Sequence, residues 1–104
     1  MLIEGASELT VGNSLIFQYP TPNDPCLLIR VNEQGYVAYS RSCTHMGCPV
    51  FFRADDDSIA CPCHGGVFSV TDGSVLAGPP PKPLPRILLE RRDGNLYATG
   101  VANS

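Results

Sequence analysis

The sequence predicts an all-β protein, a β-sandwich or small barrel, and three observations support that prediction. Short alternating or apolar runs recur along the chain and are separated by turn signals. Ten glycines and ten prolines among 104 residues make the chain rich in turns. No stretch carries apolar residues at helical spacing over the length that a substantial helix needs. The length fits one compact domain, residues 1–104.

The expected strands alternate with well-marked turns. Residues that tolerate or cap a reversed backbone mark four of these turns, at 32–35, 55–57, 71–73 and 92–95. Neither an internal repeat nor a linker is evident. The predicted strands are 14–18, 26–31, 36–40, 50–53, 58–60, 67–70, 85–90 and 96–101.

The segment 78–85 reads Gly-Pro-Pro-Pro-Lys-Pro-Leu-Pro and stands apart from the strands. It cannot be a central strand, because proline lacks a backbone donor and fixes φ. We expect a stiff surface loop. Composition leaves two interpretations of this loop open, a polyproline connector and a loop that packs on a specific neighbour.

Charge and the first residues exclude two classes of protein. The formal net charge is -3 and the Lys and Arg residues are scattered, so no basic stripe is present to follow a phosphate backbone, and we expect no nucleic-acid partner. Residues 1–9 include Glu4 and Glu8 and lack both a positive start and an apolar run. We therefore expect neither a signal peptide nor a membrane span, and a soluble chain whose compartment stays open.

The residues that can carry chemistry are concentrated in two short runs. Both histidines and four of the five cysteines lie in Cys-Thr-His-Met-Gly-Cys at 43–48 and Cys-Pro-Cys-His-Gly-Gly at 61–66. Each run can bring one cysteine and one histidine to a single centre. Such a Cys2His2 set could bind zinc, and free cysteines could simply be buried core residues. Zinc modules usually repeat like ligands in pairs, however, whereas each run here mixes the two types.

The two runs resemble the signature of the Rieske family, Cys-x-His-x-Gly-Cys followed after a gap by Cys-x-x-His-Gly. Both boxes match completely, and residues 78–81 are similar to the family's proline loop over the cluster. The resemblance implies a Rieske-type antiparallel β-sandwich or barrel with a small cluster-binding subdomain of two loops, at about residues 41–82. It also implies one 2Fe-2S cluster per chain, with two thiolates on one iron and two imidazoles on the other, an asymmetry that raises the potential. The implied ligands are Cys43, His45, Cys61 and His64.

The resemblance gives Cys48 and Cys63 a different role from the ligands. In the high-potential branch of the family, the equivalent pair forms a disulfide that joins the two ligand loops, and ferredoxins of ring-hydroxylating oxygenases usually lack it. Free, packed thiols are the other interpretation. Cys26 lies in the apolar run 26–29, which is typical of a buried structural thiol.

Two positions differ from the cytochrome bc and bf members of the family. Where those typically carry a Ser that bonds a bridging sulfide and a Tyr that bonds a ligand sulfur, this chain has Gly66 and Phe68. Hydrogen bonds to sulfur stabilise the reduced cluster, so their absence implies a potential below that of the ubiquinol enzymes.

We therefore expect an electron-transfer protein that is no enzyme by itself, a subunit or soluble domain of a respiratory or photosynthetic-type oxidoreductase complex. The expected redox partner is a cytochrome, a molybdenum-enzyme subunit or a quinol-oxidising complex. Leu84-Pro85-Arg86 and the run 43–49 are similar to the small subunit of arsenite oxidase. The chain departs from that subunit at 65–66 and is shorter between Val31 and Tyr36, so the choice among these partners stays open. The alternatives are a free-standing Rieske ferredoxin that serves a separate oxidoreductase, and a zinc-stabilised binding module.

Overall fold

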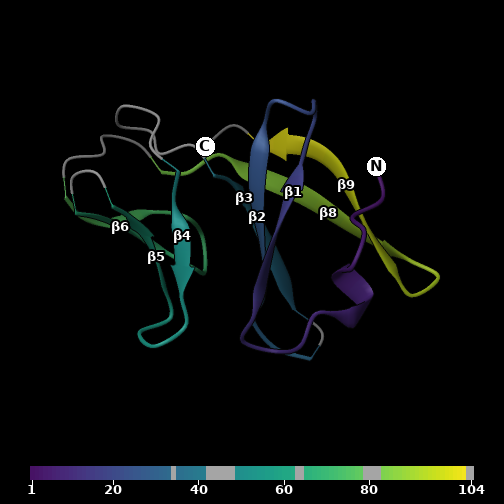
Figure 1. Cartoon of the computed structure of the whole chain (residues 1–104), viewed down its shortest axis with the longest axis horizontal. Coiled ribbons are helices and arrows are strands. Elements are labelled where there is room, and N and C mark those ends of the chain that lie inside the picture. Colours follow the sequence, from purple (N-terminus) through teal and green to yellow (C-terminus); the bar gives the residue numbers. More distant parts are fainter. Residues whose placement is uncertain (34, 42–48, 63–64, 79–82, 103–104) are drawn as a thin grey trace.

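The computed structural model describes residues 1–33, 35–41, 49–62, 65–78 and 83–102. Within these ranges the chain forms antiparallel strands in two sheets and one short 3-10 helix, η1 (Ala6–Glu8) (Figure 1). No helix of the described residues has the length and apolar character needed to cross a membrane. The expectation of an all-β sandwich or barrel is confirmed.

The larger sheet has five strands in the order β1-β2-β3-β8-β9. The first three are consecutive in the sequence. β8 pairs with β3, although the four strands of the second sheet lie between them in the sequence. Leu2 pairs with Tyr97, which adds the N-terminal residues to the outer edge of this sheet. The strands are β1 (Ser14–Gln18), β2 (Pro25–Arg30), β3 (Tyr36–Ser40), β8 (Arg86–Arg92) and β9 (Asn95–Ala102).

The smaller sheet is a four-stranded meander inserted between β3 and β8, and the two sheets lie side by side in Figure 1. Its strands are only three or four residues long: β4 (Phe51–Arg53), β5 (Ser58–Cys61), β6 (Gly66–Ser69) and β7 (Val75–Ala77). The first three were expected, with small shifts at their ends. No sequence pattern predicted β7, because two of its three residues are exposed and it pairs only with β6.

Two apolar clusters account for the long apolar run of β2. Cys26 and Leu28 pack into the interior of the five-stranded sheet, with partners that include Phe17 and Ile87. Leu27 and Ile29 point to the opposite face and join a cluster formed with the smaller sheet. Since alternate residues of a strand face opposite sides, β2 is apolar throughout because both of its faces are covered.

Tyr39 joins the two sheets. Its side chain is fully buried, and its hydroxyl donates a hydrogen bond to the carbonyl of Val70, 2.7 Å away, just beyond β6. Gly73 makes room for the ring: it has a φ of +76°, and a side-chain carbon there would lie 2.9 Å from Cε1 of Tyr39. Burial raises the pKa of Tyr39 to about 12, so the hydroxyl stays protonated and keeps donating at neutral pH.

Candidate metal centre

The first predicted ligand run lies between β3 and β4, and hydrogen bonds hold its two ends together. The amide of Val50 donates to the carbonyl of Arg41 (2.7 Å), and Nε of Arg41 donates back to the carbonyl of Val50 (3.0 Å). The amide of Arg41 also donates to the carbonyl of Pro25, at the start of β2. The residues between these ends, 42–48, lie outside the described ranges, and they include the predicted ligands and disulfide partner Cys43, His45 and Cys48.

The second predicted run begins at the end of β5. Cys61 is the last residue of that strand, only 2% exposed, and a free thiol in the structure. It pairs with Gly66 at the start of β6, so residues 62–65 form a short connection between two registered strands. Cys63 and His64 belong to this connection but lie outside the described residues. Of the four predicted ligands, the structure therefore describes Cys61 alone.

The register of β5 and β6 places the two atypical positions on the same side of the sheet as Cys61. Directly opposed residues of an antiparallel pair share a face, and residues two apart along a strand do so as well. Cys61 is opposite Gly66, and Ile59 is opposite Phe68. Phe68 is fully buried in the cluster that also contains Cys61. Neither Gly66 nor Phe68 offers a side-chain donor on this face.

The segment 78–85 is held by specific contacts on both sides of its undescribed part. Gly78, at its start, packs against the backbone of Gly66. Leu84 is fully buried in the cluster between the sheets, and its amide donates to the carbonyl of Gly73. The amide of Ser40 donates to the carbonyl of Pro85 at 2.8 Å. Of the two interpretations left open by composition, these contacts favour a loop that packs on specific neighbours.

The residues around Cys61 fit an iron–sulfur centre better than a site for a hard cation. A buried free thiol is a soft ligand, and it lies among apolar side chains that exclude water. The aspartates of the smaller sheet lie in turns instead: three are in the β4–β5 turn at 55–57, where Asp56 pairs with Arg53 at 2.9 Å, and Asp72 is in the β6–β7 turn. Among the residues that the structure describes, no three or more metal-ligating side chains gather into a group that could hold a metal ion.

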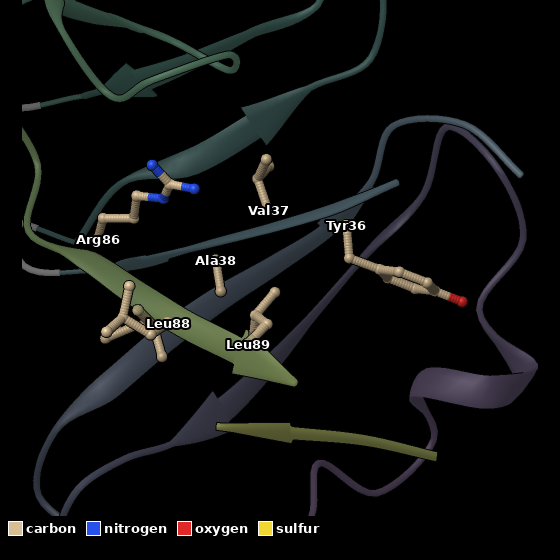
Figure 2. A pocket seen from close by; sticks show the side chains of 7 residues that line it. Tyr36, Val37, Ala38, Arg86, Leu88 and Leu89 are labelled. Carbon is tan, nitrogen blue, oxygen red and sulfur yellow. The ribbon is translucent and has the colours of Figure 1, made fainter. Parts of the chain in front are cut away.

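A cavity of about 200 Å³ lies elsewhere, between β3 and β8 (Figure 2). These strands share only one registered pair, Tyr39 with Arg86, and the space opens beside it. The lining consists of Tyr36, Val37, Ala38, Arg86, Ile87, Leu88 and Leu89, without cysteine or histidine. This cavity offers no ligand for a metal, so we do not place the functional site there.

A small all-β fold with a buried cysteine at the start of the second predicted ligand motif is typical of a small metalloprotein, and comparison with known proteins identifies the family. The profile of the Rieske [2Fe-2S] domain matches residues 3–88. The chain belongs to the Rieske family. As a member it carries a 2Fe-2S cluster and functions in electron transfer, as the two sequence motifs implied.

The chain is similar in sequence to Rieske subunits of more than one redox complex. The chain is 39% identical to the putative respiratory nitrate reductase subunit Rieske of Haloferax mediterranei, over 85% of this chain and 48% of the relative. It is 35% identical to the cytochrome b6-f complex iron-sulfur subunit of Chlorobaculum tepidum, over 90% and 50%. The chain thus spans about half the length of these curated relatives.

A solved structure of another kind is also similar. It is the complex of reduced oxygenase and oxidised ferredoxin in carbazole 1,9a-dioxygenase, of which one chain matches with a TM-score of 0.73 and 28% identity. The match covers 91% of this chain and 87% of that one. The fold is therefore shared by Rieske domains of complexes and by a chain of an oxygenase system.

Proposed function

We propose that this chain is the Rieske electron-transfer part of a respiratory or photosynthetic-type oxidoreductase complex and performs no catalysis by itself. The observation that carries the proposal is the position of Cys61, a buried free thiol at the end of β5 where the second motif begins. In our proposal it shares one iron with Cys43, and the other iron is bound by two histidines, His45 and His64. A 2Fe-2S cluster bound there accepts and returns a single electron.

The protein's own contribution is to hold the two motifs at fixed positions. The Arg41–Val50 pair of hydrogen bonds closes the first ligand loop at its base. The β5–β6 register fixes the direction of Cys61, and the fully buried Phe68 and Leu84 keep its surroundings apolar. Such rigid support limits the movement of the protein when the cluster gains or loses an electron, and this favours electron transfer.

We further propose that Cys48 and Cys63 form a disulfide between the two ligand loops. The presence of this cysteine pair supports the high-potential branch over the oxygenase ferredoxins, because those ferredoxins usually lack it. Intact-mass measurement after alkylation under denaturing conditions tests this. We expect only Cys26 and the ligand cysteines to react before reduction of the demetallated protein, and two further alkyl groups after reduction. Full alkylation without a reductant would show that no disulfide is present.

The basic proposal is tested by the metal content and spectrum of the purified protein. We expect two irons and two acid-labile sulfides per chain, a coloured protein, and an EPR signal that appears on reduction. A colourless protein that contains zinc would instead support the zinc-stabilised module. Reconstitution with iron and sulfide in the absence of oxygen should precede a negative conclusion.

The partner is tested in the native cells. Because the named relatives are subunits of a nitrate reductase and a cytochrome b6-f complex, we propose that a tagged chain co-purifies with a cytochrome b or a molybdenum-enzyme subunit. The similarity to a chain of the carbazole dioxygenase system keeps a free ferredoxin as the second candidate. A chain that purifies alone and reduces an oxygenase would support that candidate.

A further inference from the structure

The outer side of β1 is a free strand edge. β1 is the last strand of the larger sheet, and β2 is the strand that pairs with it among the described residues. Successive residues of a strand turn their amide and carbonyl groups to opposite sides. Asn13 accepts a backbone hydrogen bond from the end of β2, and Tyr19 donates one to the residue just before β2. The odd-numbered residues of β1 therefore face β2, and the backbone groups of Ser14, Ile16 and Gln18 point outward.

This edge lacks the features that usually keep a strand edge from pairing with another chain. Protected edges are very short, carry a charge or a proline, or contain a bulge. β1 has five residues, none of them charged or proline, and its register with β2 is continuous. The other edges differ: β4 and β7 have three residues each, β4 ends with Arg53, and Leu2 pairs along β9. Among the described edges, that of β1 is the one available for pairing.

Apolar side chains lie along the free edge. Ile16, at the centre of β1, is 46% exposed. A groove of about 400 Å³ runs between β1 and the first four residues, where Met1 and Leu2 are exposed as well. Unpaired backbone groups beside apolar surface provide what an added strand needs, main-chain hydrogen bonds and contacts for its side chains.

We propose that β1 pairs antiparallel with β1 of a second copy of this chain, in a two-fold dimer. The outward-facing residues are evenly spaced about Ile16, so Ile16 is set against Ile16 of the second copy, and Ser14 against its Gln18. Each of these pairs can exchange two hydrogen bonds. No like charges oppose each other, because the strand contains none. A two-fold contact uses the same edge on both copies, so assembly stops at the dimer.

The contact is small, so the dimer is weak and forms on concentration. Stable protein interfaces bury about 1,200–2,000 Å², and a single five-residue strand covers only a small part of such an area. The pairing involves neither predicted ligand run and leaves Cys61 in its own sheet. This inference is therefore independent of the proposed cluster.

Sedimentation velocity of the purified holoprotein over a concentration series measures the association. We expect monomer at roughly 10 µM and a rising share of dimer towards roughly 1 mM. Ile16→Lys should weaken the association about tenfold, since it sets two like charges opposite each other and removes an apolar contact. Monomer at every concentration would refute the proposal and leave the edge to a segment of another protein.

Leu88→Lys is the matched control. Leu88 is 43% exposed, similar to Ile16, but lies on β8, which has a neighbouring strand on each side. It should associate like wild type, and both lysine variants should retain the iron content of the wild type. Equal association of the two variants would refute the role of the β1 edge. A chain without a 2Fe-2S cluster that still forms this dimer would refute the proposed function and support this inference.

Hydrogen exchange of the wild-type protein provides a measurement that needs no variant to fold. The amides of Ser14, Ile16 and Gln18 should exchange fast in dilute protein and several-fold more slowly in concentrated protein. The amides of Leu15 and Phe17 face β2 and should exchange slowly at both concentrations. If the protein dimerises while exchange of the outward-facing amides stays independent of concentration, the dimer uses another surface and the proposal is wrong.

Discussion

The two sheets divide stability and chemistry between them. The five-stranded sheet has strands of five to eight residues, long registers and an apolar cluster of its own. The four-stranded sheet has strands of three or four residues, and its large buried side chains share their apolar cluster with Leu27, Ile29 and Tyr39 of the larger sheet. The larger sheet is therefore a scaffold, and the smaller one depends on it to present Cys61 and the ligand loops.

This difference shows why a ligand site can be built on very short strands. A three- or four-residue strand has few ladder hydrogen bonds, so most of its stability comes from packing on another element. Here that packing is concentrated at Tyr39, Phe68 and Leu84, all fully buried. Changes in the scaffold should lower stability, whereas changes in the smaller sheet should alter the cluster itself.

The largest effect should be the loss of the cluster on replacing Cys61, the buried thiol of the smaller sheet. Cys26, the buried thiol of the larger sheet, provides the control. Cys26 and Cys61 are both free and 1% and 2% exposed. Cys61→Ser should abolish the cluster, because it removes one of the two proposed thiolate ligands of one iron. Cys43→Ser and His64→Ala should do the same. Cys26→Ser should retain the full iron content and lose about 1 kcal/mol of stability, as expected for a buried thiol replaced by a hydroxyl.

Iron analysis and the visible spectrum of the two serine variants provide the measurement. A Cys61→Ser protein with the wild-type spectrum would show that Cys61 is a core residue and no ligand. Loss of the cluster in a folded Cys26→Ser variant would contradict the claim that the larger sheet contributes stability and not cluster binding.

The next effect concerns the bond that joins the sheets. Tyr39→Phe leaves the buried carbonyl of Val70 without its donor and should cost about 1–3 kcal/mol of unfolding free energy. Tyr36→Phe is the matched control on the same strand, since its hydroxyl donates to the carbonyl of Ala6 over a longer 3.4 Å and is only half-buried. Thermal unfolding should show a clearly smaller loss for the control. Equal losses would mean that the Tyr39 bond is not the main link between the sheets.

A smaller effect concerns the potential, and it follows from the two positions that lack donors. Rieske centres span roughly -150 to +300 mV, and we expect this one in the middle of that range. Gly66→Ser should raise the midpoint, because position 66 shares a face with Cys61 and a hydroxyl there would stabilise the added electron. Phe68→Tyr should raise it further. Gly66→Ala controls for the added carbon alone.

Protein-film voltammetry of both single variants and the double variant tests this prediction. If the midpoint stays constant or falls in all three while the cluster remains intact, the backbone near Gly66 already satisfies the sulfurs. The argument from missing side chains would then be wrong.

The smallest effect is a loss of stability at alkaline pH through Cys26. Burial raises the pKa of its thiol from 9.0 to about 11, so the folded protein holds this proton more tightly than the unfolded chain. The contribution is fully present below pH 9 and is lost as the pH rises towards 11. The melting temperature should fall across this window, and Cys26→Ser should flatten the fall. An unchanged slope in Cys26→Ser would contradict this assignment.

The sequence predicted much of the fold because most strands carry their own signal. Residues 14–18 and 36–40 match β1 and β3 from end to end, and the turn at 92–95 contains Asp93 and Gly94, both with positive φ. β7 could not be predicted, because Leu76 and Ala77 are exposed and the strand exists only through its pairing with β6. The limits of the cluster-binding subdomain, about 41–82, stay a prediction.

The sequence motifs predicted the ligand residues of the site. They did not predict the tertiary contacts that hold the ligand loops in place. The spacing of cysteine and histidine indicated the family, but no local pattern marks Arg41 as the closure of the first loop or Gly78 as a contact of Gly66. Arg41 and Val50 are nine positions apart in the sequence, and Gly66 and Gly78 are twelve apart. These contacts depend on the tertiary arrangement, which alternation and turn signals do not contain.

Mössbauer spectroscopy of the protein enriched in iron-57 tests the central claim most directly, because it distinguishes the two irons by their ligands. If Cys43 and Cys61 bind one iron and His45 and His64 the other, the oxidised protein should show two distinct ferric sites of equal area. On reduction, the ferrous signal should appear at the site with histidine ligands, since neutral imidazoles compensate its positive charge less than thiolates do. A single type of iron, or no iron with bound zinc, would contradict the proposed ligand set.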